Sequence, residues 1–378
     1  MRSSIARLAA LALTAASLAC ATAGGPATGG PGPGGRRGPN GNRRVSDTTS
    51  SPATVWPVKT QEHVDVWLHS FAMIQDDTTT VPFFRRGYKA EMNDLKRRSN
   101  VTTQLDANIA RLRARLAVNP QLVNAQFLPL YFDSFDEMAQ GIDIMYRADG
   151  NPQAASSQQA ASLIQLMSGY FPSQPDRDWA RLFVQSVRDE DTRFYKAYWN
   201  QQQSERTTVV TSVANLWQNT YRPRLQNFLN NTGQAGGEIL LSLPLDGEGR
   251  TLSSGKRQNT SVVNFPTTPA RAVEAIYVIV HELGGNIVQT AVKDNVTPTD
   301  QRIGLADHYI AAGTVRAGAI LLQKVSPDLV DGYARYYLNS ANKSVGTNAT
   351  ASLALAFPLP DKIRDAISRQ VDVVLGGI

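Results

Sequence analysis

The sequence predicts a mainly α-helical protein with one small sheet, an α+β fold in which a helical N-terminal block precedes a region of strands and further helices. Apolar residues recur at three- and four-residue spacing through most of 61–230, which is typical of helices packed on one face. After Gly236-Gly237 the spacing changes to two and short strand-like segments begin. A strongly apolar helix is then expected over 270–292, followed by helices over 298–323, 326–341 and 359–375.

The N-terminus, residues 1–19, has the layout of a secretion signal peptide: Arg2 and Arg7 precede an apolar run that is too short to span a bilayer. The only cysteine, Cys20, follows this run directly and resembles the lipid-modified cysteine of bacterial lipoproteins. This resemblance implies an exported protein of the bacterial cell envelope, anchored to the membrane through Cys20. Ordinary cleavage after Ala21 or Ala23 is the alternative, because small residues stand at the required spacing there.

Residues 20–52 are dominated by glycine, proline and polar residues, a composition that predicts a flexible tether. The helical block is expected over 53–235 and the strand-and-helix region over 236–378. Within the block, a stripe of Phe135, Met138, Ile142 and Met145 predicts core packing. Helical periodicity occurs in the segments 61–73, 84–98, 102–117, 120–131, 134–147, 154–169, 175–203 and 206–230.

The charge distribution argues against nucleic-acid binding. The net charge is +6, but residues 1–44 hold six arginines and no acidic residue. Removing these six from the 38 basic residues leaves 32, which equals the 32 acidic residues, so the remainder of the chain is formally neutral. A surface that binds phosphates needs a concentrated excess of Lys and Arg. The single cysteine also rules out an intramolecular disulfide.

Three strands are expected after residue 236, at 238–243, 250–252 and 261–265. The segment Asp246-Gly-Glu-Gly249 predicts a turn that joins the first two strands as a hairpin. Charged residues flank this hairpin, namely Glu238, Asp246, Glu248 and Arg250, and they are interpreted either as guides for a peptide or as ordinary turn residues.

The motif that carries chemistry is His281-Glu282, which lies inside the apolar run 276–288. Burying a carboxylate and an imidazole costs several kcal/mol unless each is paired, hydrogen-bonded or bound to a metal. In the helical motif His-Glu-x-x-His, two histidines four residues apart bind zinc and the glutamate activates the metal-bound water.

On these residues and on the order of strands and helix, the stretch 236–323 resembles the zincin metallopeptidases. The resemblance implies a sheet with a substrate-binding edge strand, zinc as the cofactor, His281 as a metal ligand, Glu282 as the general base and peptide-bond hydrolysis as the reaction. The chain departs from the motif at Gly285, where the second histidine would stand. His308 and its neighbour Asp307 are the candidates for a further ligand, although the gluzincin branch uses a glutamate there and no glutamate follows Glu282.

The sequence therefore predicts a relative of zinc metallopeptidases that lacks a complete zinc site and binds a peptide or protein partner in a groove by strand addition. An active metallopeptidase with a non-standard ligand set is one alternative. The other is a helical envelope scaffold without catalytic chemistry, in which Arg316 pairs with Glu282 while His281 hydrogen-bonds to the backbone or to Asp307.

Overall fold

The computed structural model describes residues 55–76, 79–253 and 258–376. The predicted signal peptide and tether, with Cys20, lie outside the described residues, so export and lipidation stay predictions. In the part of the chain that is described, no helix is both long enough and apolar enough to cross a membrane.

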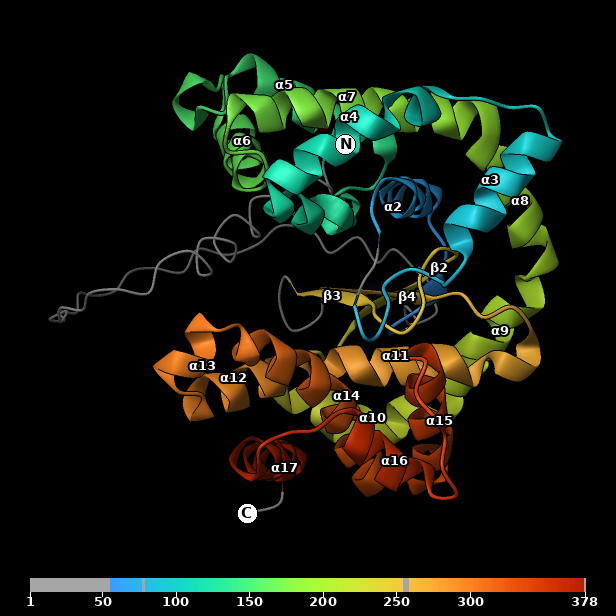
Figure 1. Cartoon of the computed structure of the whole chain (residues 1–378), viewed down its shortest axis with the longest axis vertical. Coiled ribbons are helices and arrows are strands. Elements are labelled where there is room, and N and C mark those ends of the chain that lie inside the picture. Colours follow the sequence, from blue (N-terminus) through green and yellow to red (C-terminus); the bar gives the residue numbers. More distant parts are fainter. Residues whose placement is uncertain (1–54, 77–78, 254–257, 377–378) are drawn as a thin grey trace, which may run out of the picture.

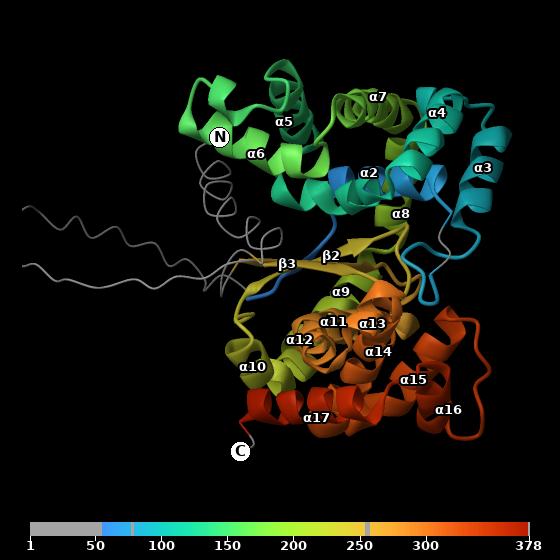
Figure 2. The ribbon, with the colours of Figure 1, turned by 60° about the vertical axis from the view of Figure 1, so that its left-hand side comes forward.

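Helices cover both faces of one small sheet, which confirms the predicted mainly α fold with a small sheet. In Figures 1 and 2 the sheet lies between the helices of the N-terminal half and most helices of the C-terminal half. Each face belongs to its own hydrophobic core, because successive side chains of a strand point to opposite faces. Ile239 and Leu241 pack with the C-terminal helices, whereas Leu240 packs with the N-terminal ones.

The sheet has four strands in the order β1-β2-β4-β3 among the described residues. β1 (Val58–Lys59), β2 (Gly237–Ser242) and β4 (Asn259–Asn264) are parallel neighbours, with Leu240 opposite Val262. β3 (Arg250–Ser253) is an edge strand, antiparallel to β4. The three predicted strands overlap β2, β3 and β4, but the two residues of β1 are too few to show a period.

The predicted hairpin between the first two strands is wrong, because β3 pairs with β4 and not with β2. The chain after β2 instead runs beside the segment 82–85. Asp246 N–H donates to the carbonyl oxygen of Phe83 at 2.7 Å, and Glu248 N–H donates to that of Pro82 at 3.2 Å. This segment therefore satisfies its backbone groups with a distant part of the chain, which the local sequence pattern does not reveal.

The N-terminal block follows the predicted helices closely. Ser134 caps one of them by accepting a hydrogen bond from Glu137 N–H, as sequence capping rules predict. Met138, Ile142 and Met145 of the predicted stripe are buried, which confirms their core role. The segment 120–131 forms a 3₁₀ helix, with Pro129 inside it. The helices are α2 (Glu62–Ile74), α3 (Tyr88–Arg98), α4 (Gln104–Val118), η2 (Pro120–Tyr131), α5 (Phe135–Arg147), η3 (Pro152–Ala154), α6 (Gln158–Tyr170), α7 (Gln174–Glu190), the π-helical η4 (Asp191–Tyr195) and α8 (Lys196–Glu205).

The C-terminal half contains every predicted helix, with two interruptions. The helix expected over 270–292 divides at Gly284, and the one expected over 298–323 divides at Gly304, whose φ of 77° favours glycine. The helices are α9 (Thr207–Leu216), the π-helical η5 (Trp217–Tyr221), α10 (Arg222–Asn231), η6 (Pro269–Arg271), α11 (Val273–Leu283), α12 (Gly285–Asn295), α13 (Pro298–Arg302), α14 (Leu305–Val325), η7 (Pro327–Leu329), α15 (Val330–Ser340), α16 (Ala349–Ala356) and α17 (Asp361–Leu375).

The core on the C-terminal side of the sheet includes helices that precede residue 236. α9 and α10 contribute Val213, Leu225 and Phe228 to the core of the C-terminal helices. The long helical connection from α7 to α10 therefore passes from one side of the sheet to the other, at the right-hand edge of Figure 1.

Buried polar groups join the sheet and the helices. Asp65 of α2 accepts hydrogen bonds from Ser242 Oγ, from Leu243 N–H at 3.1 Å and from Trp199 Nε1–H at 2.9 Å. Deeper in the N-terminal core, Glu190 lies 2.9 Å from His69 Nε2 and accepts from Lys96 Nζ at 2.7 Å. These networks satisfy groups that would otherwise destabilise the folded state.

Candidate functional site: a carboxylate and histidine cluster in a cavity

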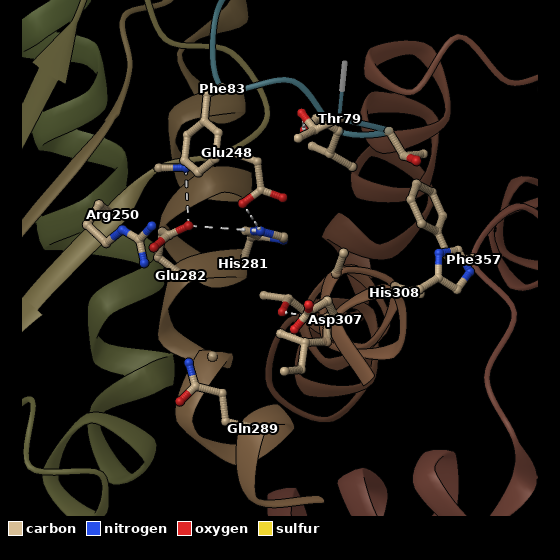
Figure 3. Close-up of a pocket in the computed structure, with 18 of the residues that line it drawn as sticks. Thr79, Phe83, Glu248, Arg250, His281, Glu282, Gln289, Asp307, His308 and Phe357 are labelled. Atoms are coloured by element: carbon tan, nitrogen blue, oxygen red, sulfur yellow. Dashed lines mark hydrogen bonds and ion pairs between the residues drawn. The ribbon is translucent and has the colours of Figure 1, made fainter. Parts of the chain in front are cut away.

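A cavity of about 430 Å³ opens beside the edge strand (Figure 3). Its walls come from the segment 79–83, the turn at 248–250, the junction of α11 and α12, and parts of α14 and α16. A concave site with convergent polar groups is the first place to look for binding or chemistry. The lining includes the four predicted site residues and two of the charged residues expected beside the hairpin, namely His281, Glu282, Asp307, His308, Glu248 and Arg250.

His281 and Glu282 lie in the last turn of α11, which packs against β4 and α14. The helix is buried because apolar residues such as Val278 and Ile279 face the core on several sides. The side chain of His281 is 1% exposed and that of Glu282 is 12% exposed. Both groups therefore need a partner within the protein.

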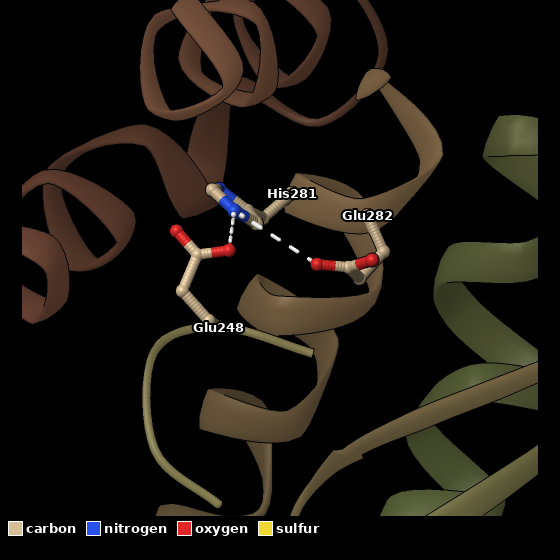
Figure 4. A group of neighbouring side chains, drawn as sticks. All are labelled: Glu248, His281 and Glu282. Carbon is tan, nitrogen blue, oxygen red and sulfur yellow. Dashed lines mark hydrogen bonds and ion pairs between the residues drawn. The ribbon is translucent and has the colours of Figure 1, made fainter. Parts of the chain in front are cut away.

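The partner of His281 is Glu248, from the turn before β3 (Figure 4). His281 Nε2 lies 3.0 Å from Glu248 Oε2 and 3.9 Å from Glu282 Oε1. Glu282 Oε1 also accepts a hydrogen bond from Gly249 N–H at 3.1 Å. Two neighbouring residues of one turn thus hold the two neighbouring residues of α11.

Glycine is required at position 249 for this arrangement. A Cβ atom there would lie 2.5 Å from the carbonyl oxygen of Val262 and 3.2 Å from Glu282 Cγ. No side chain fits at that separation from a backbone oxygen, so the close approach of the turn to α11 depends on Gly249.

The pKa values of the buried pair reflect these contacts. Burial lowers the pKa of His281, but the charge and hydrogen bond of Glu248, with the charge of Glu282, outweigh it, so the net pKa is raised. Burial and the charge of Glu248 raise the pKa of Glu282, against the opposing effects of His281, Arg250 and Gly249 N–H. Both shifts arise because two carboxyl groups and one imidazole share a site that is largely shielded from water.

Glu248, His281 and Glu282 form a group that could hold a metal ion. Each offers one ligand atom, and these atoms lie within 4.8 Å of one another. Imidazole nitrogen and carboxylate oxygen are ligands that zinc accepts. The fit is incomplete, because a metal-bound histidine normally donates its other ring N–H to an acceptor. Nδ1 of His281 is buried and has no hydrogen-bond partner among the described residues.

The structure brings the predicted site residues to one cavity but not to one ligand set. Asp307 and His308 line the cavity with His281 and Glu282, yet neither belongs to the group of close ligand atoms. Gly285, four residues after His281, also lines the cavity, and a Cβ atom built on it would meet nothing within 4 Å.

The pairing of Arg316 with Glu282, expected in the alternative of a helical scaffold, is wrong. Arg316 Nη1 donates instead to the carbonyl oxygens of Ala354 and Phe357, at 3.3 and 3.4 Å. The expected hydrogen bond from His281 to the backbone or to Asp307 is also replaced, by the contact with Glu248. The buried motif is therefore compensated from the turn before β3 and not from α14.

Glu248 is the residue of the cluster for which the sequence predicted no metal-binding or catalytic role, because it was interpreted only as a charged residue beside a hairpin. A further signal in the sequence is the Gly-Glu-Gly triplet, because its flanking glycines allow the backbone to approach a neighbouring segment closely. No family model, no curated protein and no solved structure matches the chain.

Proposed function

We propose that this chain is an exported protein of the bacterial cell envelope, related to zinc metallopeptidases, that binds an extended peptide or protein segment beside the cluster without a complete catalytic zinc site. One observation carries the proposal: edge strand β3 begins two residues after Glu248, so the cluster, the cavity and a strand edge lie together. An edge strand can add a further strand through its backbone groups.

The composition of the cavity supports a peptide ligand. Ile310, Ala312 and Phe357 supply apolar lining for a side chain, while Glu248 and Glu282 supply acceptors for N–H groups. In strand addition, backbone hydrogen bonds contribute affinity and adjacent pockets select side chains. The net charge of the chain beyond its basic N-terminus is zero, which also favours a peptide ligand over a polyanionic one.

The ligand chemistry argues for binding more than for hydrolysis. If all three close groups bound one zinc ion, Glu282 would become a ligand and no general base would be assigned. If Glu282 acted as the base, only Glu248 and His281 of this group would remain as ligands of the ion. Catalytic zinc sites normally have three protein ligands.

A peptide-binding experiment tests the proposal. Random peptides displayed on phage are selected on the immobilised protein, and the dissociation constants of enriched peptides are measured. Ala311 lines the cavity and is exposed, so Ala311→Trp should fill the cavity without unfolding the protein. We expect it to weaken binding at least about tenfold, equivalent to about 1.4 kcal/mol. Enrichment of no peptide, or equal binding by this variant, would contradict the proposal.

The matched control is Ala114→Trp, which adds the same side chain at an exposed alanine of α4 outside the cavity. It should bind peptides as the unaltered protein does. Equal loss in both variants would mean that tryptophan disturbs the protein non-specifically, and the cavity would lose its assignment.

Metal-dependent peptide hydrolysis is the second candidate, and the close ligand atoms of Glu248, His281 and Glu282 favour it. Zinc held there would polarise a peptide carbonyl or lower the pKa of a bound water molecule. Zinc content is measured after purification in zinc-replete buffer, for the unaltered protein and for His281→Ala. His63→Ala is the control, because His63 contacts the backbone oxygen of Phe132 and does not line the cavity.

Near-stoichiometric zinc that is lost only in His281→Ala, together with cleavage of a fluorogenic peptide, would favour the hydrolase. Absence of bound zinc under these conditions would exclude the hydrolase candidate. Peptide binding without zinc supports the first candidate alone.

A further inference from the structure

The imidazole of His281 has one hydrogen-bonded nitrogen. Nε2 contacts Glu248, whereas Nδ1 is buried without a partner among the described residues. In functional sites the orientation of a histidine ring is usually set by a hydrogen bond at its second nitrogen. Here the packing around the ring has to supply that orientation.

Tyr337 of α15 supplies the packing. Its ring stacks on His281 with centroids 5.1 Å apart and an interplanar angle of 23°. The side chain is fully buried, so the two rings share a rigid environment. The stacked ring restrains rotation of the imidazole about its Cβ–Cγ bond. A hydrogen bond at Nδ1 would otherwise restrain this rotation, and the described part of the chain provides none.

The same tyrosine also contacts the turn that carries Glu248. Tyr337 Oη–H donates to the carbonyl oxygen of Gly247 at 3.1 Å, one residue before Glu248. α15 presses on this turn elsewhere, since a Cβ atom on Gly247 would lie 2.6 Å from Ser340 Oγ. Tyr337 is thus bound to both sides of the contact between His281 and Glu248.

We infer that Tyr337 is a positioning residue that holds the His281 ring and the Glu248 turn in register for the site. The face of the phenol ring orients the imidazole, and the hydroxyl fixes the position of the turn relative to the imidazole through its hydrogen bond to Gly247. Tyr337 does not line the cavity, so its role would be to position the site and not to contact a ligand. The inference rests on the proposed function for its purpose, but the contact it describes exists in the unliganded protein.

The test uses Tyr337→Phe, which keeps the stacked ring and removes only the hydroxyl. Tyr88→Phe is the matched control: Tyr88 is as deeply buried but lies in the N-terminal core, and the variant loses a hydroxyl that contacts His69 Nδ1 at 3.0 Å, away from the turn. The chain has four histidines, so ring-¹⁵N labelling and the variant His281→Gln identify the His281 signal.

The first measurement is the rate at which the His281 Nε2 proton exchanges with water, with no ligand present. Tyr337→Phe should accelerate exchange about fivefold or more, the change expected when one buried hydrogen bond stops opposing local opening. Tyr88→Phe should leave the rate within about twofold although it too removes a buried hydroxyl. Equal exchange rates in the two variants would overturn the inference and assign Tyr337 a purely structural role.

The second measurement is the affinity for a peptide enriched on the unaltered protein, which should fall in Tyr337→Phe and not in Tyr88→Phe. An accelerated exchange rate with no peptide bound by any form would keep the positioning role and reject the proposed function. Unchanged peptide affinity in Tyr337→Phe, with binding by the unaltered protein, would reject the positioning role.

Discussion

Gly285→His restores the residue that the resemblance to zinc metallopeptidases expects four positions after His281. The helix divides at Gly284 between them, but Gly284 keeps right-handed helical backbone angles, with φ −79° and ψ −13°. A Cβ atom at Gly285 meets nothing within 4 Å, and the position lines the cavity. The new imidazole should therefore reach the side of the cluster without a steric cost.

The expected gain in zinc affinity follows from the added ligand. Structural zinc sites with four ligands bind with about 10–16 kcal/mol, or roughly 3 kcal/mol for each ligand. One further imidazole should tighten zinc binding about a hundredfold, since a factor of ten is about 1.4 kcal/mol. Protein stability should rise by a few tenths of a kcal/mol at most, because histidine has a somewhat better helix propensity than glycine.

The assay is competition for zinc with a chromophoric chelator, supported by the absorption spectrum of the cobalt(II) form. Gln289→His is the control, because Gln289 lines the same cavity one helical turn beyond Gly285. If Gly285→His folds normally and binds zinc no more tightly than Gln289→His, position 285 does not face His281. The structural reasoning about α11 and α12 would then be refuted.

Three further predictions concern stability. Asp65→Ala leaves three buried donors without an acceptor and should reduce the free energy of unfolding by about 3–5 kcal/mol. The control, Asp143→Ala at the surface of α5, should change it by less than about 0.5 kcal/mol. Urea unfolding measures both changes. Burial opposes ionisation of Glu190, but its contacts with a histidine and a lysine lower its pKa to about 2, below the ordinary value of 4.5. This stabilisation, about 3 kcal/mol, is present above pH 4.5 and is lost as the pH falls towards 2. The difference in free energy of unfolding between the unaltered protein and Glu190→Gln should therefore shrink over that pH range. A difference that stays constant would contradict the lowered pKa of Glu190. Gly249→Ala forces a Cβ atom against the carbonyl oxygen of Val262 and should cost about 1–3 kcal/mol in thermal unfolding, and no measurable loss would show that the turn relaxes freely.

The helices and strands were largely predictable because their causes are local. The stripe of Met138, Ile142 and Met145 and the cap at Ser134 each act within a few residues, and both appear as expected. The division at Gly304 needed the backbone angle, because a glycine within a helical pattern is compatible with either a helix or a break.

The candidate site was predictable only in part. His281 and Glu282 were recognisable because ionisable groups in an apolar helix require compensation. Their actual partners are Glu248 for His281 and the N–H of Gly249 for Glu282. The turn that carries both is placed by a backbone hydrogen bond to Pro82 and by contacts from α15, and neither can be read from nearby residues. The erroneous pairing of Glu282 with Arg316 arose because both lie in apolar helices, a pattern that does not state which side chains face each other.

Residue periodicity alone was enough to establish the mainly helical class, the position of the small sheet and the presence of a buried acid and imidazole that need partners. The order of the strands and the identity of those partners depended on the folded chain. Both arise from contacts between segments far apart in sequence, such as 82–85 with 244–248, whose free energy appears only when the sheet and the two cores form together.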